Sequence, residues 1–300
     1  CSQKEWCRGQ PAGRNMLRRL WSAELPNPGR LEEMKKEAQA ILSPDVFDGA
    51  RFEFNKTLTQ KFALNHTVFM GSSAMPASYE FGANFGDESV LLASRIDMAG
   101  RLNGRVNCQL SDSWLARLQA QVSPESPSAA SSLKLDLDYK GSSCCAGATY
   151  MGGGLLGGHY MKSVTPALAL GGEVFYHLSK HVRGGGAAAR LLLGPKGESV
   201  ATAKAGSFGN VELAYTHKVS EKVGLATELQ YYHGQVCTFG LGYEFRLRQA
   251  TFKGLIQSDT TCSAALEERV SSGVNLLLSG QLNHKKKDYK FGFGLVIGAQ

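Results

Sequence analysis

The sequence contains one glycine-rich motif of the kind that can bind a cofactor. Residues 152–157 read Gly-Gly-Gly-Leu-Leu-Gly and match the GxGxxG pattern that holds the pyrophosphate of a dinucleotide. Such a site needs a strand before the motif and a helix that begins at its last glycine, but residues 158–162 have the composition of a strand. The seven histidines show no metal-ligand spacing, and no Ser/His/Asp arrangement stands out. We therefore expect no enzyme, no cofactor and no metal site.

Acidic side chains that alternate with apolar ones are the second candidate for chemistry. Asp136 and Asp138, for example, alternate with Leu135, Leu137 and Tyr139. Successive side chains of a strand point to opposite faces, so the acids of such a run share one face. We expect a water-filled face to carry Glu53, Asp97, Asp136, Asp138, Glu173, Glu212, Glu228 and Glu244, beside Arg51, Arg95, Lys134, Lys140, Lys222 and Arg246. Carboxylates gathered in this way can hold a basic ligand by charge.

The same alternation extends over most of the chain after Gly49, as in residues 133–140, 237–247 and 289–298. The runs last roughly 8–12 residues, close to the length of a tilted membrane strand. About 250 residues, at about 13 for a strand and its turn, give roughly 19 strands. An open sheet of that width would have unpaired edges, which lipid does not tolerate and which closure removes. The sequence therefore predicts an all-β fold, a closed transmembrane β-barrel over residues 49–298.

The composition of the chain is compatible with a membrane barrel, although its mean hydropathy is that of a soluble protein. The chain has 43% hydrophobic residues, 35 glycines and 9 prolines. The mean hydropathy is -0.19. A membrane barrel can have such a value, because the apolar residues of the lipid face and the polar residues of the water face cancel in the mean. The net charge of +7 comes from scattered Lys and Arg, with no basic patch interleaved with aromatics, so we expect no nucleic acid as partner. Seven cysteines without a CxxC pair favour a chain made in the reducing cytosol.

The N-terminal part precedes the alternation. Residues 1–28 are predicted to be a flexible basic segment, and the arginines within residues 1–26 are compatible with a transit peptide or a disordered tail. Residues 29–44 are predicted to form an amphipathic helix, because apolar residues recur at helical spacing between Leu31 and Leu42. Its other positions, such as Glu33 and Lys36, suit a wet lumen better than lipid, so we expect this helix inside the barrel.

Several strings in the chain are not dictated by alternation. They are residues 27–29 (Asn-Pro-Gly) with Glu32 and Glu33, residues 65–68 (Asn-His-Thr-Val), residues 102–103 with 109–110, residues 163–173 (Ser-Val-Thr-Pro-Ala-Leu-Ala-Leu-Gly-Gly-Glu) continuing through Tyr176 and His177, and residues 283–285 with 292–298. In these strings the chain resembles the channel-forming subunit of the mitochondrial outer-membrane translocase, the TOM complex, a relative of the mitochondrial porins. The resemblance covers residues 27–298.

The resemblance implies a 19-stranded barrel with an inner helix and a cation-preferring pore in the mitochondrial outer membrane. Its expected cargo is unfolded precursor proteins with basic presequences, which the inner acids would contact. Its expected partners are small single-helix TOM subunits, the central TOM receptor, a second copy of the barrel and membrane lipid. Replacing Asp136 and Asp138 by Asn is then expected to lower cation selectivity and to leave the fold intact.

Three alternatives remain open from sequence. The inner carboxylates could pair with inner Arg and Lys and only hold the barrel's shape. The cargo could be metabolites and ions, as in a porin of the VDAC type. The chain could also be a soluble all-β binding protein.

The last strand has a further pattern. Lys290 is followed by Gly292, Leu295 and Ile297, which resembles the signal read by the machinery that inserts outer-membrane barrels. Lys290 and Gly292 share the predicted water face, and Leu295 and Ile297 share the lipid face. We expect these four residues to act as an assembly signal, although barrel geometry alone could produce the same pattern.

Overall fold

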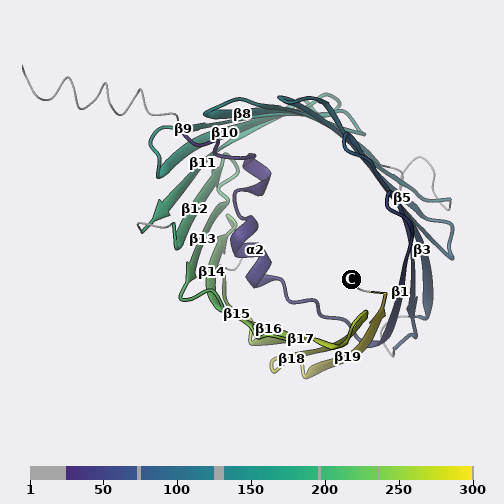
Figure 1. Cartoon of the computed structure of the whole chain (residues 1–300). Coiled ribbons are helices and arrows are strands. Elements are labelled where there is room, and N and C mark those ends of the chain that lie inside the picture. Colours follow the sequence, from purple (N-terminus) through teal and green to yellow (C-terminus); the bar gives the residue numbers. More distant parts are fainter. Residues whose placement is uncertain (1–24, 73–75, 125–131, 195–196, 235–236, 299–300) are drawn as a thin grey trace, which may run out of the picture.

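Alternating side chains give a sheet two faces, and in this chain the sheet closes on itself. The structure, a computed structural model, describes residues 25–72, 76–124, 132–194, 197–234 and 237–298. Within these residues, nineteen strands form one ring around a central lumen (Figure 1). The prediction of a closed barrel is confirmed. The strands are β1 (Gly49–Thr59), β2 (Phe62–Phe69), β3 (Ser78–Gly86), β4 (Val90–Asp97), β5 (Leu102–Ser111), β6 (Trp114–Val122), β7 (Ser132–Lys140), β8 (Cys144–Met151), β9 (Leu155–Ser163), β10 (Leu168–His177), β11 (Val182–Leu193), β12 (Ser199–Gly206), β13 (Val211–Lys218), β14 (Val223–Tyr231), β15 (Thr238–Arg246), β16 (Ala250–Gln257), β17 (Thr261–Ser271), β18 (Val274–Asn283) and β19 (Asp288–Ile297).

Strands that follow one another in sequence pair antiparallel, and the ring closes where β1 meets β19. With an odd number of strands, the first and last run in the same direction, so this pair is parallel. Gly49 lies opposite Gly292, and Arg51 lies opposite Gly294. Closure pairs every strand on both sides and leaves no edge exposed.

The two faces of the ring differ in chemistry. The outer face carries large apolar side chains that nothing covers, such as Val174 at 67% exposed and Phe291 at 66%. The buried apolar residues are few, and they lie between the ring and the segment inside it. The interior is therefore a lumen rather than a packed core.

Two short helices lie inside the ring (Figure 1): the 3-10 turn η1 (Leu31–Glu33) and the α-helix α2 (Lys36–Leu42). The inner position agrees with the prediction, but one continuous helix does not form. The helix is interrupted at Lys35, whose φ and ψ of −94° and 7° are not helical. It ends at Leu42, since the α conformation is disfavoured for Ser43, the residue before Pro44. None of the helices in the described part of the chain is long and apolar enough to cross a membrane.

Tight turns join neighbouring strands, and several contain glycine. Gly100 and Gly209 have φ values of +73° and +74°, a region that glycine enters without strain. Residues 152–154 also form a turn, and β9 begins at Leu155, within the glycine motif. A strand follows where a dinucleotide site needs a helix, as the sequence indicated.

Candidate functional site

A strap of chain inside the lumen defines the candidate site. We call residues 25–48 the inner segment; they run inside the lumen from β9 to β18 and lie against the wall on one side (Figure 1). At one end, Ser163 Oγ donates a hydrogen bond of 2.7 Å to the carbonyl oxygen of Pro26. At the other end, Ser279 Oγ donates one of 3.0 Å to the carbonyl oxygen of Phe47. The inner segment is thus bound to the barrel at both ends.

Apolar contacts hold the middle of the inner segment. Leu31 and Met34 pack against Met161, Ala169 and Ala188, and all five are buried. These wall residues are mostly small, which allows a helical turn to approach a strand closely. Burial of a side chain such as Leu31 contributes on the order of 1.5–3 kcal/mol.

Glycines of the wall make room for the end of α2. A Cβ added at Gly224 would lie 3.0 Å from Ile41 Cδ1, and one at Gly242 would lie 2.9 Å from Leu42 Cδ2. Ile41 and Leu42 are buried, with Ala214 and Ala226 in the same cluster. The wall at β13–β15 is therefore shaped to receive this helix.

Ion pairs complete the attachment of α2. The ammonium group of Lys35 donates hydrogen bonds to Glu212 and to Glu228, the latter at 3.0 Å, and Arg190 donates one to Glu37. Burial alone would lower the pKa of Lys35, but the hydrogen bonds and charges of the two carboxylates prevail and raise it. Lys35 is therefore held in its charged form.

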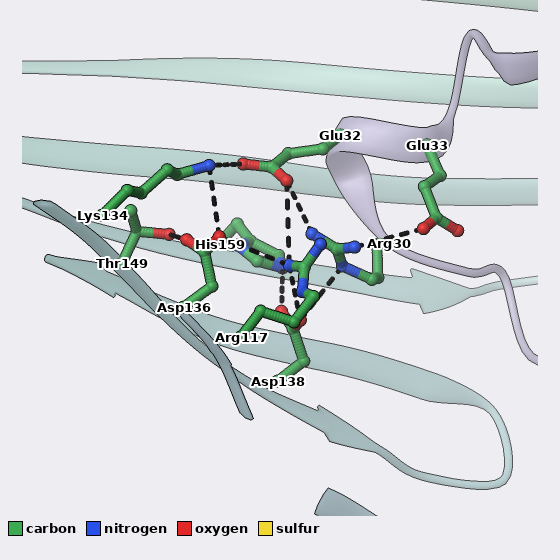
Figure 2. Close-up of polar contacts among 9 residues, drawn as sticks. All are labelled: Arg30, Glu32, Glu33, Arg117, Lys134, Asp136, Asp138, Thr149 and His159. Atoms are coloured by element: carbon green, nitrogen blue, oxygen red, sulfur yellow. Dashed lines mark hydrogen bonds and ion pairs between the residues drawn. The ribbon is translucent and has the colours of Figure 1, made fainter. Parts of the chain in front are cut away.

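Around η1 the polar contacts form a cluster between β6, β7 and the inner segment (Figure 2). Arg117 and Asp136 are direct neighbours across the two strands. Arg117 Nη2 lies 2.7 Å from Asp138 Oδ2 and 3.6 Å from Asp136 Oδ2. Arg30 Nε of the inner segment lies 3.1 Å from the same Asp138 oxygen. Asp136 and Asp138 are only 2% and 3% exposed, so both charges depend on these partners.

Glu32 extends the cluster toward the lumen (Figure 2). Its carboxylate accepts hydrogen bonds from Lys134 at 2.9 Å and from Arg30 at 2.6 Å. Burial alone would raise the pKa of Glu32, but the hydrogen bond and charge of Lys134, together with Arg30, prevail and hold it below its usual value. We call Arg30, Glu32, Arg117, Lys134, Asp136 and Asp138 the latch, because they join the inner segment to the wall.

The cross-strand register places all eight predicted acids on the lumenal face, and each lies in an ion pair. The pairs are Glu53 with Arg51, Asp97 with Arg101, Asp136 with Lys134, Asp138 with Arg117, Glu173 with Lys204, Glu212 and Glu228 with Lys35, and Glu244 with Arg246. They do not gather into one site, since they follow the wall from β1 to β15. Within the described chain, no three His, Cys, Asp or Glu side chains are placed to hold a metal ion.

Sequence reasoning missed several of the cations that form ion pairs in the lumen. Arg30 and Lys35 lie in the inner segment, and Arg190 and Lys204 lie on strands whose pairing the sequence does not give. The alternation of side chains along β6 could have placed Arg117 on the lumenal face, but it could not have identified Asp138 as its partner. The predicted lumenal cations Arg51, Lys134 and Arg246 do pair with acids.

The four residues of the predicted assembly signal lie on β19 as their spacing suggested. Lys290 and Gly292 face the lumen, and Leu295 and Ile297 face outward. Gly292 also leaves room for the inner segment, because an added Cβ would collide with the carbonyl oxygen of Phe47. Its role in packing the inner segment must be separated from any role in assembly.

Comparison with known proteins shows which families and structures the chain resembles. The family model described as eukaryotic porin matches residues 27–292. The chain is 36% identical over 287 residues to a probable mitochondrial import receptor subunit TOM40-2 of Arabidopsis thaliana, with 91% of each chain covered. It is 31% identical to the human mitochondrial import receptor subunit TOM40 homolog, with 91% of this chain and 79% of the relative covered.

A solved structure of similar fold is a mutant of the Rh. blastica porin. It superposes with a TM-score of 0.50 at 10% sequence identity, covering 79% of this chain and 96% of the porin. At that identity the likeness concerns the barrel fold alone.

Proposed function

Because the chain belongs to the eukaryotic porin family and, within it, to the TOM40 proteins, we propose that it is the protein-conducting channel of the mitochondrial outer-membrane translocase. The observation that carries this function is the identity to import receptor subunits over 91% of the chain. It is a channel and not an enzyme. Its cargo is unfolded precursor proteins.

The barrel's dimensions fit the membrane. The strands contain 8–12 residues, and a tilted transmembrane strand needs about 9–11. Exposed apolar side chains such as Phe291 and Val174 cover the outer face, where lipid would contact them. The chain therefore lies in the outer membrane as a multi-strand barrel, with its polar face toward the pore.

The acids of the lumen are proposed to contact basic presequences by exchange of partners. Glu53 and Glu173 are the best placed, since their side chains are 28% and 27% exposed and pair with one cation each. An incoming arginine can replace Lys204, which is 26% exposed, and Arg51 keeps its second partner Asp45 when Glu53 exchanges partners. Asp136 and Asp138 are almost fully buried, and their main role is to hold the latch. Weak contacts of this kind allow a chain to enter and also to leave.

The partners follow from the same assignment. Small single-helix TOM subunits, the central TOM receptor and a second copy of the barrel would pack on the outer face, which offers apolar surface in the plane of the membrane. Precursors with basic presequences would occupy the lumen. Lipid would cover the remaining outer surface.

A planar-bilayer recording tests the function. The purified barrel, inserted in a bilayer, is exposed to a synthetic basic presequence and to an acidic peptide of equal length. We expect the presequence alone to produce brief blocks whose frequency rises with voltage. A channel that neither peptide blocks, while ATP or another small anion reduces its current, would instead be a metabolite porin of the VDAC type.

A further inference from the structure

The lumenal face of β4 to β7 contains a cavity that the proposed function does not use. It has a volume of about 530 Å³, and β5, in its middle, lies across the lumen from α2 (Figure 1). Its polar lining comes from Arg95, Asn103, Arg105, Gln119, Gln121 and Lys134. Among the described residues that line it there is no carboxylate, although acids lie on the wall around it. The cavity is therefore a positive site within a wall of mixed charge.

The cross-strand register places two of the cations at opposite ends of one row. Arg105 on β5 lies opposite Gln119 on β6, and Gln119 lies opposite Lys134 on β7. Neighbouring strands are about 4.8 Å apart, so this row spans about 10 Å from Arg105 to Lys134. A ligand of that length would contact a cation at each end and an amide between them.

A second row lies beside the first and brings Arg95 close to Arg105. Arg95 on β4 lies opposite Asn103, which is two residues from Arg105 on β5. The two arginines are thus diagonal neighbours, about 7–8 Å apart, a separation that long side chains can bridge. Both are exposed to the lumen and form no ion pair with a described residue. Like charges repel each other, so an anion bound between the two guanidinium groups would stabilise both.

The other charges near the cavity already have partners or lie outside it. Lys134 Nζ lies 2.9 Å from Glu32 Oε1 and 3.3 Å from Asp136 Oδ2, so its charge is balanced by the latch. Asp97, two residues beyond Arg95 on β4, pairs with Arg101, and Glu80 lies opposite Asp97. Neither of these acids lines the cavity. The charge that a ligand would balance is therefore that of Arg95 and Arg105.

The chemistry of the lining favours a phosphate ligand. The planar guanidinium group of arginine binds two oxygens of a phosphate at once. The amides of Asn103, Gln119 and Gln121 offer both N–H donors and carbonyl acceptors to the rest of a ligand. Pockets for small molecules have volumes of about 300–1,000 Å³, and this cavity lies within that range.

Two other sources of negative charge fit the cavity less well. The phosphate of a membrane lipid lies outside the barrel, whereas the cavity faces the lumen. An acidic stretch of polypeptide that extended along β4 would leave Arg95 and meet Asp97 and Glu80. A compact ligand avoids these acids, because it is contained within the cavity.

We propose that this cavity is a binding site for a small phosphorylated molecule with two or more negative charges. Arg95 and Arg105 bind its phosphates, and the amides of Asn103, Gln119 and Gln121 bind its other polar groups. The bound ligand cancels the positive charge of the two arginines. The site goes beyond the proposed function, because its ligand is held in the wall and is not cargo.

Isothermal titration calorimetry of the purified, detergent-solubilised barrel tests the site. The probe is inorganic tripolyphosphate, and an acidic peptide, hexaglutamate, is titrated in parallel. The test variant combines Arg95→Gln with Arg105→Gln. The control variant combines Lys218→Gln with Lys222→Gln, which removes the same charge from two exposed lysines near the turn between β13 and β14.

We expect saturable binding of tripolyphosphate to the unmodified barrel, weaker by at least about tenfold in the test variant, which loses two charged hydrogen-bond donors. The control variant should differ by less than about twofold, because salt screens distant charges. Absence of saturable binding, or an equal loss in the two variants, would overturn the site. Hexaglutamate that binds as tightly as tripolyphosphate, and through the same arginines, would also overturn it and assign the cavity to acidic polypeptide.

A second measurement needs no variant. Phenylglyoxal modifies accessible arginines, and mass spectrometry identifies the positions. Saturating tripolyphosphate should suppress the modification of Arg95 and Arg105 but not that of Arg248, an exposed arginine in the turn after β15. Unchanged modification of Arg95 and Arg105 would overturn the site. Block of the channel by a presequence peptide tests the proposed function independently, so either proposal can fail without the other.

Discussion

Arg30 of the inner segment lies with its Nε 3.1 Å from Oδ2 of Asp138 on β7, and this contact joins the start of the inner segment to the barrel wall. Asp138 is 3% exposed and also binds Arg117 at 2.7 Å. The carboxylate thus serves two guanidinium groups, one from the wall and one from the strap. The inner segment and the wall are therefore coupled through one buried charge.

The first prediction concerns that charge. Asp138→Asn should lower the free energy of unfolding by about 3–5 kcal/mol, because it leaves buried cations without their counter-ion. This differs from the expectation that the aspartates can be replaced without loss of fold, and the difference comes from their burial. Thermal unfolding of the detergent-solubilised barrel measures the effect.

Arg101→Ala provides the control for Asp138→Asn. It removes the partner of Asp97, but Arg101 is 56% exposed, so the expected loss is about 0–1 kcal/mol. An equal loss in the free energy of unfolding for both variants would show that the buried latch stabilises the barrel no more than an exposed ion pair does.

A second prediction concerns pH. The pKa of Glu32 is lowered in the folded state, so its contribution to docking is complete above the usual Glu value of about 4.3 and is lost as the pH falls through the lower folded value. We expect hydrogen exchange of the backbone amides of η1, corrected for the intrinsic effect of pH, to accelerate below about pH 4.3. In Glu32→Gln the corrected rate should already be high and nearly flat with pH. An unmodified chain with a flat profile would exclude Glu32 as the group responsible.

A third prediction uses two glycines of β15 that face the lumen two residues apart. Gly242→Val should displace α2, because an added Cβ already lies 2.9 Å from Leu42. Gly240→Val should be tolerated better, since its Cβ would lie at an ordinary 3.5 Å from Leu255. Loss of a helix about 10 Å wide from the lumen should raise the single-channel conductance of the first variant only. Equal conductance in the two would mean that the inner segment does not limit the open area.

The sequence predicts the face on which a strand residue lies, but not its partners. Alternation of period 2 predicted which face Asp136 and Asp138 occupy, because the direction of a side chain depends only on the local backbone. It did not predict that both are buried, since their cover is Arg30 and Glu32 from a distant segment. Lys35 and Glu212 are 177 residues apart in sequence. Such a pair depends on the register of many strands and on where the inner segment docks.

The helix shows the same limit. Apolar spacing correctly predicted that residues 31–42 would bury one side. The break at Lys35 follows from the wall instead, because Lys35 turns toward Glu212 and Glu228 while Leu31 and Met34 pack against a different set of strands. The residues next to Lys35 in sequence do not predict this break, because it depends on contacts with distant strands.

A fourth prediction concerns assembly. Leu295→Gln with Ile297→Gln should arrest the barrel at the insertion machinery, whereas Leu135→Gln with Leu137→Gln in β7 should dock normally and only weaken the finished barrel. Native gel electrophoresis of imported, radiolabelled chain separates these stages. Gly292→Leu is a poor test, because it would also displace Phe47. Arrest of both double variants at the same stage would mean that β19 carries no special signal.

The central claim is that unfolded polypeptide passes through this lumen. It is tested most directly by reconstituting the purified barrel in liposomes and adding a fluorescent precursor with a basic presequence, held unfolded by urea and then diluted. We expect a protease sealed inside the liposomes to cleave the precursor. A barrel that releases small ions and metabolites from the liposomes but admits no precursor would contradict it.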